Sequence, residues 1–211
     1  MKKILLFLSI FLLMPVVYAD EDLTPNSPSA ILIEQSTGKV LYEKNSHEKR
    51  PPASMTKVMS MLLVMEAIDN GNLKLTDSVL ISEEAAKMGG SQVFLKAGET
   101  YPVEELLKGV AIASGNDAVV ALAEKVSGSV SAFVEKMNQR ASELKMVDTV
   151  YKNPHGLDTE GHITTAYDMS LVARELLKHE KILEYTSIYE YYMKKPDNTT
   201  TWLVNTNKVV Y

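Results

Sequence analysis

The stretch PPASMTKVMSMLLVMEAID, residues 51–69, constrains the fold of this 211-residue chain more than any other. It predicts a helix over residues 53–69 that is apolar on nearly every side, and a helix of this kind is buried within a protein. Asn70-Gly71 follows it and favours the end of the helix. The remaining elements therefore have to pack around this helix.

Two polar side chains, Ser54 and Lys57, interrupt the first turn of this helix and project from the same side of it. A serine hydroxyl is inert near neutral pH unless a neighbour accepts its proton, and Lys57 is the nearest candidate. Burial among apolar residues and the positive end of the helix dipole both disfavour an ammonium ion. The same pair is equally compatible with a capping serine and a lysine that extends to solvent.

The Ser-x-x-Lys spacing is not specific by itself, because it occurs four times in the chain. At residues 36–39 it spans a predicted turn, at 46–49 it lies in a charged loop, and at 142–145 it lies on an amphipathic surface helix. Only Ser54 opens a buried helix, so only that pair is a candidate for chemistry.

A second polar motif, Ser114-Gly115-Asn116, lies between two apolar helical runs. It has two interpretations, because polar groups in such surroundings must form hydrogen bonds somewhere. The motif either caps the helix that follows or faces a cleft. In a cleft, Ser114 would pass a proton next to Lys57, and the amide of Asn116 would hold a substrate carbonyl.

The rest of the chain predicts a strand pair, a mostly helical middle and a β-type tail. Residues 30–34 and 39–43 are the expected strands of a hairpin. Thr164 is the predicted N-cap of the last helix, and the long loop before it is of a kind that often carries function. From apolar residues at three- and four-residue spacing, the predicted helices cover residues 103–113, 117–128, 129–146 and 164–180; the loop covers 148–163 and the tail 185–211.

The first 19 residues, MKKILLFLSIFLLMPVVYA, predict a signal peptide, because their apolar run is short for a membrane span and ends in small residues. An uncleaved anchor is the alternative. Residues 20–29 are polar, rich in proline and serine, and form a predicted leader into the fold. We therefore expect the protein to leave the cytoplasm.

Composition excludes several classes of function. The chain has no cysteine, which excludes disulfides and thiol catalysis, and its net charge of −5 disfavours nucleic-acid binding. The four histidines share no spacing typical of metal ligands, so a zinc peptidase is not expected. We predict neither a metal nor an organic cofactor.

Three stretches in order, PPASMTKVMS, VFLKAGETYPVEELLKGVAIASGNDA and NPHGLDTEGHITTAYDMS, resemble the penicillin-binding serine D-alanyl-D-alanine carboxypeptidases of low molecular mass, the S11 peptidase family. The resemblance runs from Ala30 to the end of the chain. It implies that Ser54 is the acylated nucleophile and Lys57 its base, with Ser114 and Asn116 as the second catalytic element. It gives structural roles to a loop below the active site, with His155, Asp158 and Asp168.

The resemblance also implies a fold and an activity. The expected fold is the α/β (α+β) β-lactamase/transpeptidase-like sandwich, an antiparallel sheet with a helical subdomain. The expected reaction removes the terminal D-alanine from peptidoglycan stem pentapeptides through an acyl-enzyme, outside the cytoplasm, in the periplasm or on the outer face of the cell membrane. β-Lactams would inhibit it, and membrane association would come from a C-terminal segment beyond this chain.

The sequence departs from the family at its third motif, Lys-Thr-Gly. The chain contains only Lys96-Ala97-Gly98, which precedes Ser114, whereas the family's motif follows the loop. We therefore expect residues 30–211 to be the N-terminal part of the domain, cut short of its last strands. Alone it is expected to be inactive, because one donor of the family's oxyanion hole lies on the missing strand, and poorly folded, because the absent strands leave an apolar sheet face and an edge uncovered.

The sequence has three alternatives to the carboxypeptidase interpretation. A class A β-lactamase is disfavoured because the loop YKNPHGLDTEGHI lacks the Glu-x-x-Leu-Asn pattern that supplies its deacylating glutamate. A non-catalytic penicillin-binding sensor or cell-wall-binding domain would be acylated without turnover. A secreted helical domain with capping serines would not be acylated at all.

Overall fold

The computed structural model describes residues 22–210. The signal peptide predicted for residues 1–19 lies outside the described residues, as does the start of the predicted leader. In chain order the elements are β1 (Ala30–Ile33), β2 (Val40–Lys44), the 3-10 turn η1 (Ala53–Thr56), α2 (Lys57–Asp69), β3 (Ser78–Leu80), α3 (Glu83–Ala86), β4 (Thr100–Pro102), α4 (Val103–Ala113), α5 (Asn116–Ser127), α6 (Val130–Glu143), α7 (Ala166–Leu176), α8 (Glu180–Thr186), β5 (Glu190–Lys194) and β6 (Thr200–Val204).

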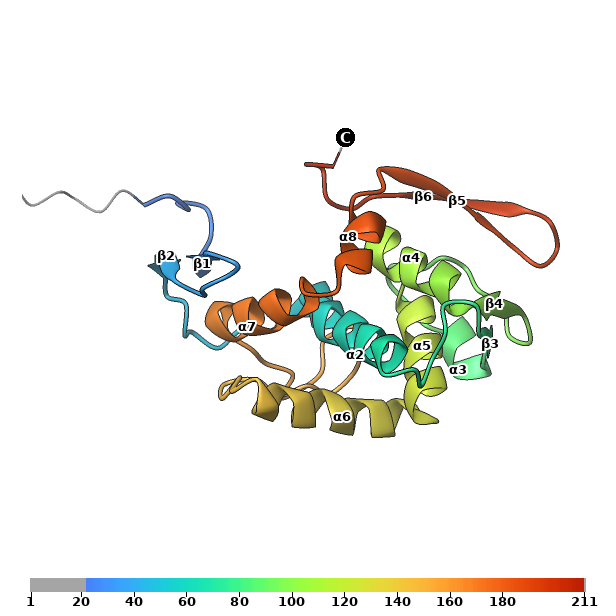
Figure 1. Cartoon of the computed structure of the whole chain (residues 1–211), viewed down its shortest axis with the longest axis horizontal. Helices are drawn as coiled ribbons and strands as arrows, with labels where there is room; N and C mark the ends of the chain where they lie inside the picture. Colours follow the sequence, from blue (N-terminus) through green and yellow to red (C-terminus); the bar gives the residue numbers. More distant parts are fainter. Residues whose placement is uncertain (1–21, 211) are drawn as a thin grey trace, which may run out of the picture.

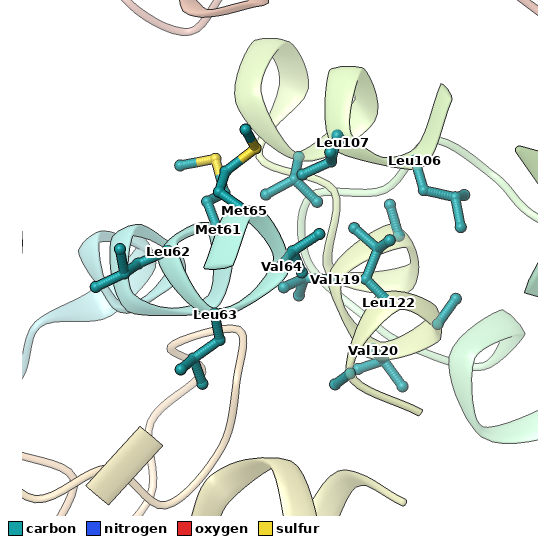
Figure 2. Close-up of a cluster of buried hydrophobic side chains, with 14 of the residues drawn as sticks. Met61, Leu62, Leu63, Val64, Met65, Leu106, Leu107, Val119, Val120 and Leu122 are labelled. Carbon is teal, nitrogen blue, oxygen red and sulfur yellow. The ribbon is translucent and has the colours of Figure 1, made fainter. Parts of the chain in front are cut away.

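Helix α2 lies at the centre of the helical body, in contact with α4, α5, α6 and α7 (Figure 1). Figure 2 shows apolar side chains of α2 directed into a core that α4 and α5 complete. Full burial of one such side chain stabilises a fold by roughly 1.5–3 kcal/mol. The prediction of a buried central helix is therefore confirmed, and the reason is that helices surround α2 on several sides. The α2 residues of this core are Met59, Met61, Leu62, Leu63, Val64 and Met65.

The predicted helices form within a few residues of their expected ends, but one cap was wrong. The side chain that caps α7 is Thr165, whose hydroxyl accepts a hydrogen bond from the Asp168 backbone N–H at 3.0 Å. Thr164 instead shares a buried hydrogen bond of 2.7 Å with the hydroxyl of Thr149. Two adjacent threonines offer the same capping chemistry, and the partner across the loop determines which one is free to cap.

One pair of strands was not predicted. Strands β3 and β4 pair antiparallel within the middle region that was expected to be mostly helical. Val79 and Tyr101 are register partners, and both side chains are buried. Each strand has three residues, which is too short to show the alternation by which strands are recognised in a sequence.

The predicted first hairpin is confirmed, and the tail, predicted only as β-type, forms a second hairpin. Strand β1 pairs with β2, and the Arg174 guanidinium of α7 donates to the carbonyls of Gln35 and Ser36 in the turn. Strand β5 pairs with β6, and this hairpin extends from the helical body beside α4 (Figure 1). Its outer face carries the cross-strand partners Tyr192 and Trp202, whose side chains are 56% and 60% exposed.

Over residues 22–210 the strands pair as separate two-stranded sheets, β1–β2, β3–β4 and β5–β6, around one helical body. Among those residues no helix has the length and apolar character needed to cross a membrane.

Candidate active site

Ser54 lies in the 3-10 turn η1, immediately before α2, and not in the α-helix itself as predicted. Its side chain is exposed, and no side-chain hydrogen bond caps either η1 or α2. The capping interpretation of this serine is therefore wrong. The preceding residue, Ala53, has a φ of 47°, a left-handed conformation that is uncommon for a residue with a side chain. The chain thus makes a sharp turn that presents the Ser54 hydroxyl to solvent.

Lys57 is buried, with 3% of its surface exposed, so its side chain does not extend to solvent. Its Nζ atom lies 3.2 Å from Ser54 Oγ and 2.7 Å from the carbonyl oxygen of His155. Burial lowers the pKa of Lys57 from 10.5 to about 8, because an ammonium ion is poorly solvated there. The structure therefore places an amine that is partly neutral near physiological pH beside an accessible hydroxyl.

The loop that supplies the His155 carbonyl is held by two side chains. Asn153 accepts hydrogen bonds from the backbone N–H groups of His155 and Gly156, and donates to the carbonyl of Leu157. The buried hydroxyl of Ser60, on α2, donates to the carbonyl of Pro154 at 2.7 Å. Both the lysine and the loop it contacts are therefore attached to the same helix.

Gly156 allows this loop to approach η1 closely. A Cβ at this position would lie 1.8 Å from the carbonyl oxygen of Ala53, and its φ of 89° also favours glycine. Nearby, Lys152 N–H donates to Nδ1 of the buried His162 ring, so a neutral ring carries its proton on Nε2 and donates to Thr56 Oγ1 at 2.7 Å. The loop and the turn that carries Ser54 are thus in close backbone contact at Gly156 and joined through the side chains of His162 and Thr56.

The side chain of His155 is neutral at physiological pH. Burial, together with the positive charge of Lys57 and the ring of His162, lowers its pKa to about 4. Its Nδ1 atom accepts a hydrogen bond from the N–H of Leu157. The contact between His155 and the lysine is therefore made by the backbone carbonyl, while the ring stabilises the loop.

Of the second motif, Asn116 reaches the Ser54 cavity and Ser114 does not line it. Asn116 Nδ2 donates to the carbonyl of Gly89, and its backbone N–H donates to that of Ser91, each at 2.7 Å. Ser114 ends α4 in a left-handed conformation, with a φ of 57°. Within residues 22–210 no hydrogen bond joins Ser114 to Ser54 or Lys57. The N-cap of α5 is Gly115, without a side-chain hydrogen bond, so the capping interpretation of this motif is also wrong.

A cavity of about 270 Å³ brings these parts together. Its walls include Ser54, which is the candidate nucleophile, Asn116 of the second motif and the loop of His155. Asp158 lines it too, whereas Asp168 is buried away from it and accepts hydrogen bonds from Asp148 N–H and the Thr149 hydroxyl. The lining residues are Ala53, Ser54, Gly90, Ser91, Asn116, His155, Gly156, Leu157 and Asp158.

Cavity size alone would not have found this site. A larger cavity of about 580 Å³ lies between the β1–β2 turn and helices α6 and α7, but its serine, Ser36, donates to the Glu34 carboxylate. Sequence reasoning missed Gly90, Ser91, Asn153 and Ser60. The only signal for the first two was the Gly-Gly-Ser run at 89–91, which is typical of many loops.

The other three Ser-x-x-Lys sequences do not form pairs. Ser36 and Ser46 donate to the carboxylates of Glu34 and Glu43, and Lys49 pairs with Asp148. Ser142 and Lys145 are both exposed. Within the described residues, only the Ser54–Lys57 spacing brings a serine hydroxyl within hydrogen-bonding distance of its lysine.

The chain is similar to known proteins of one family. The model of the D-alanyl-D-alanine carboxypeptidase family matches residues 17–211. The chain is 52% identical over 220 residues to D-alanyl-D-alanine carboxypeptidase DacF of Bacillus subtilis, a match that covers 100% of this chain and 57% of that protein. The chain thus spans little more than half the length of this relative.

Two solved structures are similar in fold. D-alanyl-D-alanine carboxypeptidase DacD from Francisella tularensis superposes with a TM-score of 0.82 and 33% identity, over 88% of this chain and 45% of that one. Penicillin-binding protein 6B from Escherichia coli gives 0.80 and 32%, over 90% and 62%. These similarities confirm the predicted fold class.

Proposed function

The chain belongs to the D-alanyl-D-alanine carboxypeptidase family, and from that premise we propose that its protein removes the terminal D-alanine from peptidoglycan stem pentapeptides. The observation that carries the proposal is the 3.2 Å contact between the buried amine of Lys57 and the exposed hydroxyl of Ser54. An exposed nucleophile beside a desolvated base is what acyl transfer requires.

The reaction begins with proton transfer. The neutral amine of Lys57 accepts the hydroxyl proton as Ser54 Oγ attacks the carbonyl carbon of the penultimate D-alanine. The His155 carbonyl accepts an N–H of the same amine at 2.7 Å, which directs the lone pair toward the serine. A lysine held on one side by a fixed acceptor is thus oriented as well as deprotonated.

The tetrahedral intermediate collapses as the peptide C–N bond breaks and D-alanine leaves with the proton on its amine. We assign the transfer of this proton to Lys57 and Ser114, and we propose that the Asn116 amide binds the substrate carbonyl. Water then attacks the acyl ester, with proton transfer through the same groups, and restores the Ser54 hydroxyl. His155, Asp158 and Asp168 receive structural roles, supported by the loop hydrogen bonds around His155 and Asp168.

A β-lactam would follow the same first step, since its ring amide presents a carbonyl to Ser54. The strained C–N bond opens, and the product remains attached as an ester. β-Lactams are therefore the proposed inhibitors. Labelling by a penicillin is accordingly the most direct test of the site.

The test compares the 211-residue chain with a chimera, in which the chain is joined to the part of the Bacillus subtilis relative that it does not match. Each is incubated with a fluorescent penicillin, as is its Ser54→Ala variant. We expect covalent labelling of the chimera that Ser54→Ala abolishes, and release of D-alanine from a stem pentapeptide. Absence of labelling in both proteins would contradict the proposal.

Two other outcomes would assign a different function. Rapid hydrolysis of penicillin, with little release of D-alanine, would identify a β-lactamase. Stable acylation without turnover of the pentapeptide would identify a penicillin-binding sensor or a cell-wall-binding domain.

We also propose that the protein acts outside the cytoplasm, where peptidoglycan lies. Residues 1–19 would be the signal peptide, 20–29 the leader, and 30–211 part of the carboxypeptidase domain. The apolar stretch near the N-terminus supports this assignment. The N-terminal residue of the exported protein, determined by mass spectrometry, would test it.

A further inference from the structure

We propose that Asp117 is a positioning residue for the reaction at Ser54, through the loop of residues 89–95. The inference rests on the proposed function, and it assigns to Asp117 a role that neither Ser-x-x-Lys nor Ser-x-Asn contains. In outline, the Asp117 carboxylate fixes one end of this loop and Asn116 fixes the other. The loop in turn supplies Gly90 and Ser91 to the cavity that holds Ser54.

The Asp117 carboxylate is 1% exposed and is surrounded by backbone donors. Its Oδ1 atom accepts from the N–H groups of Val93 and Ala118 at 3.0 and 2.9 Å, and its Oδ2 atom accepts from that of Leu95 at 3.1 Å. Asp117 also lies in the first turn of α5, where the helix dipole favours a negative charge. The carboxylate is therefore satisfied while buried, and within residues 22–210 it forms no ion pair.

The backbone of Phe94, which lies between the N–H groups of Val93 and Leu95, shows that contacts impose the loop conformation. Phe94 has a φ of 61°, which is unfavourable for a bulky side chain, and that side chain is 63% exposed. Burial of the phenyl ring therefore does not compensate for the strained backbone. The two N–H groups on either side of Phe94 converge on one carboxylate, and this convergence maintains the left-handed turn.

The other half of the loop is held by Asn116. Its backbone N–H donates to the carbonyl of Ser91, and its side-chain amide donates to that of Gly89. A Cβ on Gly90 would lie 2.8 Å from Asn116 Nδ2, so a side chain at this position would displace the loop or the amide. Displacement of the loop would therefore change both the cavity wall and the orientation of the Asn116 amide.

A second anchor comes from the β5–β6 hairpin but is weaker. Lys195 Nζ donates to the carbonyl of Phe94, and Lys96 pairs with Asp197 at 3.1 Å. These contacts are exposed to solvent, and exposed ion pairs contribute little. The buried carboxylate of Asp117 is thus the stronger of the two polar restraints on residues 93–95, in addition to the burial of the Val93 and Leu95 side chains in the core.

The competing explanation is that Asp117 only stabilises α5. Asp168 provides a matched control, because it is also a carboxylate 1% exposed in the first turn of a helix. It likewise accepts from a backbone N–H, that of Asp148, but it does not line the Ser54 cavity. Asp117→Asn and Asp168→Asn therefore make the same chemical change in two buried places, one connected to the cavity wall and one not.

The experiment measures the rate of acylation by a fluorescent penicillin as a function of penicillin concentration and pH. The wild type, Asp117→Asn and Asp168→Asn are compared, both in the 211-residue chain and in the chimera. Amide hydrogen exchange at Val93 and Leu95 is followed in the same proteins. Gly90→Ala is included, because it disturbs the loop beside Asn116 without removing a buried charge. If Asp117→Asn does not fold, wild-type acylation in Gly90→Ala overturns the proposal, because the loop then does not position the site.

We expect Asp117→Asn to lower the acylation rate at saturating penicillin by about 10- to 100-fold, the loss typical of a misplaced catalytic group. Val93 and Leu95 should exchange faster, and the pH midpoint of acylation should stay where it is in the wild type, because Lys57 contacts a different loop. Gly90→Ala should also slow acylation, and Asp168→Asn should slow acylation of the folded protein clearly less than Asp117→Asn does.

The proposal is overturned if Asp117→Asn acylates at the wild-type rate, or if Asp168→Asn slows acylation as much as Asp117→Asn does. It is also overturned if Val93 and Leu95 remain protected in Asp117→Asn, because the carboxylate then does not hold the loop. A wild type that is not labelled would be a failure of the proposed function. The exchange measurement would still test whether the Asp117 carboxylate holds the loop.

Discussion

The Nζ atom of Lys57 lies 2.7 Å from the carbonyl oxygen of His155, a residue 98 positions further along the chain. The proposed base is therefore placed by two parts of the sequence. One is its own helix, which buries it, and the other is a loop that fixes the direction of its N–H groups. Changes in either part should therefore alter the rate at which Ser54 is acylated.

Acylation of Ser54 should depend on pH through Lys57. Burial lowers the pKa of this lysine to about 8, and only the neutral amine accepts a proton. The rate should rise about tenfold between pH 6 and pH 7 and level off above about pH 9. Labelling with a fluorescent penicillin, quenched at a series of times, measures this rate. Lys57→Arg, which stays charged throughout, should abolish the rise, and a flat wild-type profile would contradict the assignment.

Gly156→Ala should disrupt the contact between the loop and the Ser54 turn. Its Cβ would overlap the Ala53 carbonyl, and its φ of 89° is unfavourable for alanine. We expect the free energy of unfolding to fall by roughly 2–5 kcal/mol, measured by urea unfolding and circular dichroism. Gly71→Ala is the control, because Gly71 has a similar φ but no atom within 4 Å. Equal losses in both variants would mean that the close contact has no effect.

Ser60→Ala should weaken the attachment of the His155 loop to α2. The buried hydroxyl donates to the Pro154 carbonyl, and its removal leaves that carbonyl without a partner. Thermal unfolding should show a loss of about 1–3 kcal/mol, with slower acylation in the folded protein. Ser36→Ala, an exposed serine bonded to Glu34, should change stability by less than about 0.5 kcal/mol. Wild-type stability and acylation in Ser60→Ala would refute this role.

The protein should lose stability in mild acid through His155 and His162. Burial lowers the pKa of His155 to about 4 and also lowers that of His162, from an ordinary value of 6.5. As the pH falls from 6.5 toward 4, the unfolded chain binds protons that the folded chain does not, so the free energy of unfolding decreases. Urea unfolding at several pH values measures this. His155→Gln should reduce the slope, and an unchanged slope would show that His155 does not contribute.

The sequence was sufficient to predict the central helix, the first hairpin, the Ser54–Lys57 pair and the presence of Asn116 at the site. These features depend on local patterns. Residues 51–69 contain only three charged residues, Lys57, Glu66 and Asp69, so a buried helix is the structure that they favour. The pair itself is three residues apart, so one turn brings its side chains together.

The supporting residues were not predictable in this way. Ser60 contacts a carbonyl 94 positions away, and Val93 reaches Asp117 across 24 positions. Nothing in either local sequence distinguishes such a serine or aspartate from an ordinary helical residue. The prediction of Thr164 as the cap was wrong for the same reason, because its hydroxyl bonds to Thr149 on another segment.

The outward position of Trp202 has a consequence for spectroscopy. It is the one tryptophan in the sequence, and it lies on the exposed side of the β5–β6 hairpin with its indole N–H donating to Glu190. Its emission therefore reports the hairpin, whereas the far-ultraviolet dichroism reports the helices around α2. If the two signals change together on denaturation, the hairpin and the helical body unfold as one cooperative unit; separate transitions would show that the hairpin detaches first or last.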